Sequence, residues 1–224
     1  MNTSLEYVIE KRIERTAEAL RANNMEVYTA ETRGEVAEIV ASLLKDGDVI
    51  GVGGSETLNE CGIIDLVRSE KYNFIDRYAP GLTRDEMHKL HIQAIGADTY
   101  ISGTNAITED GVLYNVDGNA NRIAAIAFGP KSVIIVAGYN KIVKDLNAAA
   151  VRVKSIAAPA NTKRLSCPTY CEKAGECLSL AEGSSVMTDG CHGDGRICCD
   201  YLISARQRIK GRIKVILVKE SLGF

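Results

Sequence analysis

Apolar residues recur at the spacing of an α-helix in three segments of the chain. These segments follow Thr3, Thr32 and Thr83, and each threonine is followed three residues later by a glutamate. This Thr-x-x-Glu pattern predicts a capping box, in which two side chains satisfy free N–H groups at the start of a helix. The sequence therefore predicts helices that begin at these threonines and extend to about Leu20, Leu44 and Ile95.

Short apolar runs rich in β-branched residues lie between the helices, at 48–52, 98–102, 132–137 and 212–218. The run at 132–137 is apolar almost throughout, which is typical of a parallel strand buried on both faces. Residues 112–116 follow a Glu-Asp-Gly turn and are predicted as one arm of a hairpin. The alternation of helices and strands predicts an α/β fold, in three α/β/α layers around a mostly parallel mixed sheet.

The regular pattern stops between 161 and 199, where cysteine, glycine and serine replace the apolar periodicity. A long stretch without regular structure inside a compact domain is usually functional. We expect one domain over 1–224, with 161–199 as a cysteine-rich, metal-binding insertion.

Composition excludes several classes of protein. Lys and Arg total 27 against 29 Asp and Glu, so the chain lacks the positive surplus of a non-specific nucleic-acid binder. Apolar residues make up 46%, too many for a disordered chain, and no apolar run approaches the ~20 residues of a membrane span. The first residues lack a signal-peptide core, which predicts a cytoplasmic protein without a membrane partner.

A glycine-rich turn joins the predicted strand 48–52 to a following helix. It contains Gly53, Gly54, Ser55 and Thr57. Glycines let the backbone approach a ligand closely, and the helix N-terminus offers free N–H groups to an anion. A plain turn with Ser55 as the N-cap explains the same residues equally well. Glu60, a few residues further on, is a candidate general base or a solvated side chain.

Polar residues gather at the ends of two other predicted strands. Thr104 and Asn105 follow the strand at 98–102, and the second group follows the strand at 112–116. Ligands in open α/β sheets bind at the carboxyl ends of strands, so we expect these residues to meet the glycine turn in one anion site. Helix capping is the alternative role for Asp117 and Asn119. That group consists of Asp117, Asn119, Asn121 and Arg122.

Six of the seven cysteines lie between Cys167 and Cys199. Thiolates bind zinc and iron–sulfur clusters, both of which need four ligands. No pair has the Cys-x-x-Cys spacing of zinc ribbons, so free thiols and disulfides stay open as alternatives. Cys167, Cys199 and His192 are possible substitutes in the ligand set. We predict as metal ligands Cys171, Cys177, Cys191 and Cys198.

Several strings of residues together resemble one known family, the LUD-domain family of lactate-utilisation proteins. The resemblance runs from about residue 5 to the end of the chain. The string Thr-Asn-Ala-Ile-Thr-Glu-Asp-Gly is the most specific of them. The strings are 53–58, 72–78, 103–111, 117–122, 128–130, 158–161 and 222–224.

The resemblance implies a fold similar to ribose-5-phosphate isomerase and CoA transferases, in which a glycine loop binds phosphate or CoA. It also implies a role in oxidising a small hydroxy acid such as lactate, beside iron–sulfur redox partner proteins. The cofactor expected from it is an iron–sulfur cluster, of the four-iron–four-sulfur type, or zinc. Extra residues between Cys177 and Cys191 set this chain apart from similar stand-alone members.

Three functions follow as expectations. The first is a component of lactate utilisation that binds a small anionic metabolite, a carboxylate or a phosphate, and carries a cysteine-bound metal centre. The second is an enzyme similar to phosphosugar isomerases or CoA transferases, with Asp117 or Glu60 as base or nucleophile. The third is a non-catalytic ligand-binding subunit in which zinc only stabilises the fold.

Overall fold

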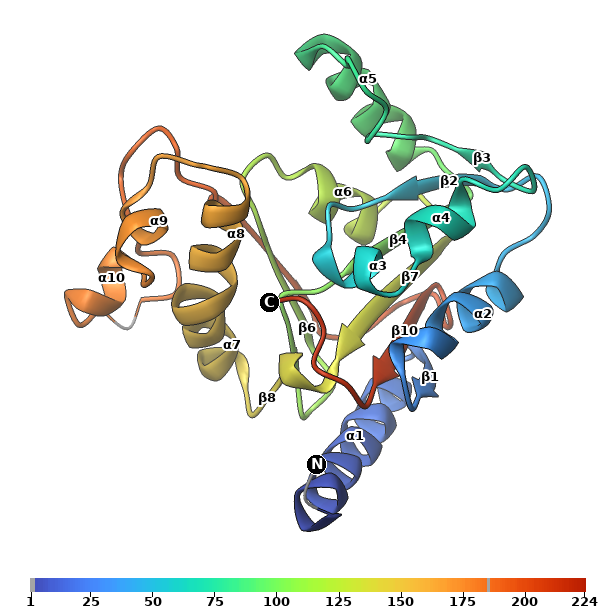
Figure 1. Cartoon of the computed structure of the whole chain (residues 1–224). Helices are drawn as coiled ribbons and strands as arrows, with labels where there is room; N and C mark the ends of the chain where they lie inside the picture. Colours follow the sequence, from blue (N-terminus) through green and yellow to red (C-terminus); the bar gives the residue numbers. More distant parts are fainter. Residues whose placement is uncertain (1–2, 185) are drawn as a thin grey trace.

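The structure, a computed structural model, describes residues 3–184 and 186–224. Its main sheet has six strands in the order β1-β10-β7-β4-β2-β3, and all of its strand pairs are parallel (Figure 1). The strands are β1 (Glu26–Ala30), β2 (Val49–Val52), β3 (Asn73–Phe74), β4 (Thr99–Gly103), β7 (Ser132–Gly138) and β10 (Ile213–Val218).

Two apolar cores cover the two faces of this sheet. Alternate residues of one strand enter different cores: Val133 and Ile135 point to one side, and Ile134 and Val136 to the other. The first core is covered by α1 (Thr3–Ala22), α5 (Arg84–Ile95) and α6 (Asn121–Ala127). The second is covered by α2 (Arg33–Leu43), α3 (Glu56–Glu60) and α4 (Ile63–Val67). The predicted three-layer α/β/α arrangement is therefore confirmed.

The antiparallel hairpin forms a second sheet, in contrast to the single mixed sheet that was predicted. This sheet has the order β8-β5-β6-β9, and β6 pairs antiparallel with both β5 and β9. Its strands are β5 (Ala106–Thr108), β6 (Leu113–Asp117), β8 (Ile142–Val143) and β9 (Asp200–Ser204). The chain leaves the main sheet after Gly103, where the hydroxyl of Thr104 donates to the carbonyls of Ala106 and Tyr114.

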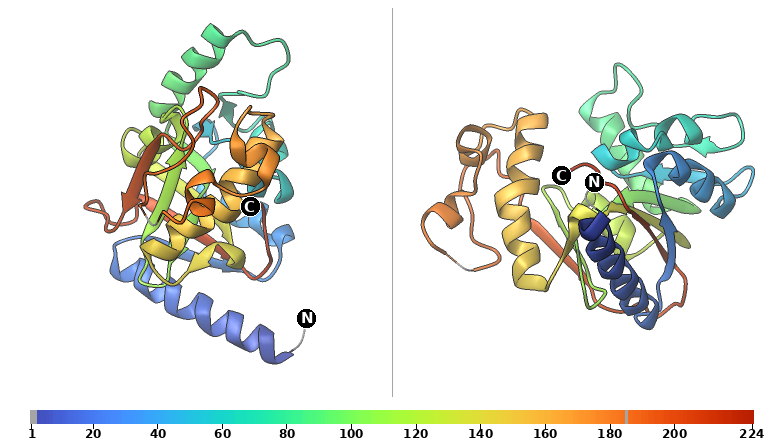
Figure 2. Two further views of the ribbon diagram at one scale, coloured as in Figure 1. Left: turned by 90° about the vertical axis from the view of Figure 1, so that its left-hand side faces the viewer. Right: turned by 60° about the horizontal axis from the view of Figure 1, so that its bottom comes forward.

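A long helical stretch packs on the second sheet. It runs without a break through α7 (Leu146–Arg152), a π-helical turn η2 (Val153–Ala157) and α8 (Ala158–Arg164). A short 3₁₀ turn η1 (Tyr139–Lys141) links β7 to β8. The region predicted as irregular contains two short helices, α9 (Tyr170–Ala174) and α10 (Leu178–Ala181). Figure 2 shows this cysteine segment on the outer side of α8.

The predicted capping boxes have different outcomes. Thr83 forms one with Glu86, as expected. Thr32 does not, because its side chain makes no cap hydrogen bond and Glu35 instead accepts from the N–H of Glu31 and the Thr32 hydroxyl. The box at Thr3 adjoins residues 1–2, which lie outside the described residues. None of the helices in 3–184 and 186–224 is both long and apolar enough to cross a bilayer.

Candidate functional site

A polar cavity of about 340 Å³ lies at the carboxyl ends of β2, β4 and β7. The end of β6, the helix α8 and the last residues of the chain complete its wall. It is lined by every residue predicted to bind the ligand except Gly53: Gly54, Ser55, Thr57, Thr104, Asn105, Asp117, Asn119, Asn121 and Arg122. The structure thus brings together three segments that lie far apart in the sequence.

Gly53 shapes the cavity without lining it. A Cβ at this position would lie 2.5 Å from Oγ of Ser102 and 3.1 Å from Cδ of Arg122. Glycine therefore leaves the space that the Arg122 side chain occupies. At Gly54, by contrast, the nearest atom to a Cβ is 3.7 Å away, in the guanidinium of Arg77.

Ser55 is the N-cap residue of α3, but its side chain makes no cap hydrogen bond. Its hydroxyl instead lies against the backbone of β4, where a Cβ on Gly103 would be 2.6 Å from it. The helix that it precedes has only five residues. The charged side chains around the cavity consequently contribute more to its potential than this single helical turn.

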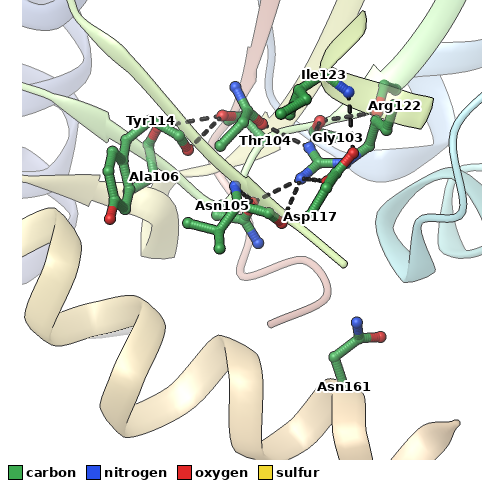
Figure 3. Close-up of polar contacts among 12 residues, drawn as sticks. Gly103, Thr104, Asn105, Ala106, Tyr114, Asp117, Arg122, Ile123 and Asn161 are labelled. Atoms are coloured by element: carbon green, nitrogen blue, oxygen red, sulfur yellow. Dashed lines mark hydrogen bonds and ion pairs between the residues drawn. The ribbon is translucent and has the colours of Figure 1, made fainter. Parts of the chain in front are cut away.

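Arg122 and Asp117 form a buried ion pair at the cavity wall, 2.6 Å apart (Figure 3). The Arg122 guanidinium also donates to the side-chain oxygens of Asn105 at 2.8 Å and Asn115 at 2.5 Å. It donates further to the carbonyl oxygens at positions 103 and 116. Its N–H groups are therefore all engaged by the protein.

The two carboxylate oxygens of Asp117 are also engaged. One accepts from Arg122 Nε at 2.9 Å, and the other accepts from the N–H of Ile123 at 2.9 Å. The protein thus fixes the orientation of both oxygens. These contacts support a positioning role, in which the pair fixes the end of β6 to α6 and to the β4–β5 turn.

Other polar side chains on the wall are available to a ligand. In the described part of the chain, the side chains of Arg77, Asn119 and Asn121 line the cavity without a hydrogen bond to the protein. From the opposite side, Asn161 on α8 faces the cavity (Figure 3). Arg164, one turn further along, donates to the Asn161 side chain at 2.6 Å.

Lys141 is a cavity residue that sequence analysis missed. It is only 3% exposed, and its Nζ donates to Oγ1 of Thr57 at 2.9 Å. Burial, together with the neighbouring cations Arg152 and Arg122, lowers the Lys141 pKa to about 7. Its position shortly after the carboxyl end of the buried strand 132–137 is the sequence feature that could have identified it as a site residue.

Glu60, the other candidate base, lies outside the cavity. Its carboxylate accepts from the N–H of Gly223 at 3.1 Å and lies 3.8 Å from Arg33. It thereby helps to hold the segment 222–224, which places Phe224 on the cavity wall. Figure 1 shows this segment between α3 and α8.

The cysteine segment contains a second, small cavity of about 20 Å³. The four cysteines predicted as metal ligands line it, namely Cys171, Cys177, Cys191 and Cys198. The possible substitutes Cys167, Cys199 and His192 do not. Burial and the neighbouring thiols raise the Cys198 pKa to about 12. Within 3–184 and 186–224, however, no three His, Cys, Asp or Glu side chains are arranged to hold a metal ion. The four thiols match zinc or an iron–sulfur cluster in the number and kind of ligands, but among the described residues they are not placed to bind one ion together.

The two cavities share a wall. Val153, Ala158, Ile197 and Cys198 line both of them. One of the four clustered thiols therefore also borders the polar cavity.

Fold and site together define an α/β protein with a cation-lined cavity at the carboxyl ends of a parallel sheet. The sequence profile of the LUD domain matches residues 13–218, and the chain belongs to this family. It is thus related to lactate-utilisation proteins, and the resemblance seen in the sequence is confirmed. Comparison with curated proteins gives no match.

One solved structure supports the fold. A DUF162 family protein from Deinococcus radiodurans is similar with a TM-score of 0.52 and 15% identity, over 94% of this chain and 98% of that one. The delta subunit of eIF2B from Chaetomium thermophilum is 20% identical with a TM-score of 0.35, over 50% of this chain and 48% of that one. The latter likeness covers only part of the fold.

Proposed function

We propose that the polar cavity binds a small anionic metabolite, a carboxylate or a phosphate, and that the protein acts in lactate-related redox metabolism. The charge of the cavity wall carries this proposal. Three arginines line it, Arg77, Arg122 and Arg164, together with Lys141, against two acidic side chains, Glu56 and Asp117. Asp117 is paired with Arg122, and Glu56 lies 3.9 Å from Arg164, so Arg77 leaves a positive charge for a ligand even when Lys141 is neutral.

Hydrogen-bond donors on the cavity wall add to this attraction. Ser55, Asn119 and Asn121 add neutral groups that can donate hydrogen bonds to anionic oxygens. A hydroxy acid offers both a carboxylate for the cations and a hydroxyl for the amides.

Titration calorimetry at low salt tests anion binding, with L-lactate, pyruvate and inorganic phosphate as probes. We expect at least one to bind, and Arg77→Ala to weaken that binding about tenfold, which corresponds to about 1.4 kcal/mol. Arg15→Ala is the matched control, because Arg15 is an exposed arginine of α1 with a side chain 61% exposed. Absence of binding for all three anions would refute the proposal.

The four clustered cysteines belong to the proposed function as ligands of an iron–sulfur cluster or of zinc. When bound, a cluster supplies one-electron transfer, whereas zinc supplies only structural stability here. The shared wall supports the redox version, since a group held by Cys198 would border the polar cavity directly. Electrons would then pass to iron–sulfur partner proteins in the cytoplasm.

Anaerobic reconstitution with iron and sulfide tests this part. We expect a brown protein whose visible absorbance is lost in Cys171→Ser and Cys198→Ser. Cys167→Ser and Cys199→Ser are the controls, since neither residue lines the thiol cavity. A colourless protein with bound zinc would refute the electron-transfer role, and full metal content in both ligand variants would refute the ligand set.

The cavity volume favours one alternative. Cavities of about 300–1,000 Å³ typically hold ligands well above the size of lactate. At about 340 Å³, this cavity also has room for a phosphorylated sugar, as an isomerase-like enzyme would require. Sugar phosphates added to the same calorimetry distinguish the two, because the isomerase-like function requires tighter binding of the sugar phosphate than of lactate.

A further inference from the structure

We propose that the ε-amine of Lys141 reacts reversibly with the carbonyl group of a small 2-oxo acid held in the polar cavity, forming an imine. This inference rests on the proposed function, because the cavity must first bind the anionic part of the molecule. It assigns to Lys141 a covalent role that anion binding alone does not require.

The position of Lys141 suits such a reaction. The residue is the last of the turn η1 that follows β7; its side chain lines the cavity, while solvent reaches only 3% of the residue. Its Nζ lies 2.9 Å from Oγ1 of Thr57, so the hydroxyl fixes the direction of the amine. A Cβ on Gly103 would lie 3.6 Å from Nζ, which shows that the backbone of β4 passes close by.

The charges around Lys141 favour the neutral, nucleophilic amine. In the described part of the chain, it makes no ion pair with a carboxylate. The groups that act on it from the packed elements are Arg152 of α7, Arg122 of α6, and Glu60 and Cys61 at α3. The two arginines oppose protonation more strongly than Glu60 and Cys61 favour it, and desolvation opposes it most. A lysine desolvated beside other cations is a recognised form of activated nucleophile.

Lys154 shows that burial alone does not create this environment. It is nearly as buried, at 6% exposed, but it lines the thiol cavity and not the polar cavity. Its ammonium donates to the carbonyl of Val186 at 2.6 Å, an oxygen that stabilises the charge. The two lysines are therefore a matched pair with opposite expected reactivity.

The chemistry balances without any further reactant. The nitrogen lone pair of Lys141 attacks the carbonyl carbon, and the carbonyl oxygen takes up a proton from the nitrogen to give a carbinolamine. The carbinolamine then loses its oxygen as water, and a C=N bond replaces the C=O bond. The cations Arg77 and Arg164 line the same cavity and offer charge to the carboxylate of the oxo acid.

Trapping with borohydride tests the inference on the whole protein. Incubation with pyruvate followed by borohydride should raise the intact mass by the mass of pyruvic acid less one oxygen atom. Peptide mapping should place the modification on Lys141. The rate of modification should rise with pH through about 7, as the amine loses its proton.

Two variants serve as controls. Lys141→Arg keeps the positive charge and should abolish the adduct, whereas Lys154→Arg should retain it, with thermal melts verifying that both variants fold. The unmodified chain carries the decisive result in any case, because mapping needs no variant. If lactate or phosphate binds but pyruvate leaves Lys141 unmodified, the imine is refuted while the proposed function stands. If no anion binds and no adduct forms, both fail.

Discussion

Replacing Arg122 by alanine removes the centre of the hydrogen-bond network beside the polar cavity. The change leaves the carboxylate of Asp117 without its ion-pair partner, although that side chain is only 6% exposed. It also leaves the side-chain oxygens of Asn105 and Asn115 and two backbone carbonyls without this donor.

The expected loss is large. Removal of one partner from a buried ion pair costs about 3–5 kcal/mol, because the other charge remains desolvated. The free energy of unfolding of a whole domain is about 5–15 kcal/mol, so Arg122→Ala should remove a substantial part of it. The stability of Arg122→Lys should lie between those of the wild type and Arg122→Ala, because an ammonium keeps the charge but cannot reproduce the planar arrangement of donors in a guanidinium.

Urea denaturation followed by circular dichroism measures this loss, since the chain contains no tryptophan. The pair Lys11–Glu14 provides the control. Its atoms are also 2.6 Å apart, but its side chains are 44% and 49% exposed. Lys11→Ala should change the free energy of unfolding only slightly, because an exposed ion pair is screened by solvent. If Arg122→Ala costs no more than Lys11→Ala, the positioning role of the buried pair is wrong.

Three further predictions follow from the same structure. Gly53→Ala should destabilise the protein by about 1–3 kcal/mol in urea melts through its close contacts, whereas Gly54→Ala should be nearly neutral; equal losses would contradict this. Burial lowers the Lys141 pKa from 10.5 to about 7. Between pH 7 and 10.5 this lysine is protonated in the unfolded chain but neutral in the folded protein, so the free energy of unfolding should rise with pH over that range. The free energy of unfolding of wild type minus that of Lys141→Met should show this rise; a flat difference from pH 7 to 10 would contradict it. In metal-free protein, iodoacetamide should modify the exposed Cys199 before Cys198, whose raised pKa disfavours the thiolate, as mass spectrometry can show.

The predictable part of the fold is the part whose residues are buried on both sides. Strand β7 is apolar almost throughout because helices cover both faces of the sheet, and the sequence shows this directly. Strand β1 was missed because it lies at the sheet edge and its residues alternate without a clear apolar face. The departure of the hairpin into a second sheet depends on the hydroxyl contacts of Thr104, which hydropathy does not reveal.

The candidate site was predictable where polar residues follow predicted strands. Ser55 and Asp117 meet at one cavity because both stand at strand ends, as expected. The saturation of Arg122 depends on atoms of β6 and of the β4–β5 turn and appears only in three dimensions. Lys141 and Arg77 were missed because an isolated basic residue is usually solvated, and only the fold turns these two inward.

The order of the strands has a consequence for how the protein is made. Strand β10, near the end of the chain, lies between β7 and the edge strand β1, which is made first. Pairing across so many residues gives a high contact order, and such topologies fold slowly. During synthesis, β1 and the neighbouring edge of β7 stay unpaired until β10 has been made. Until then their backbone groups and apolar side chains are exposed. Completion of the main sheet, and of the cavity wall formed by 222–224, therefore belongs to the last stage of folding.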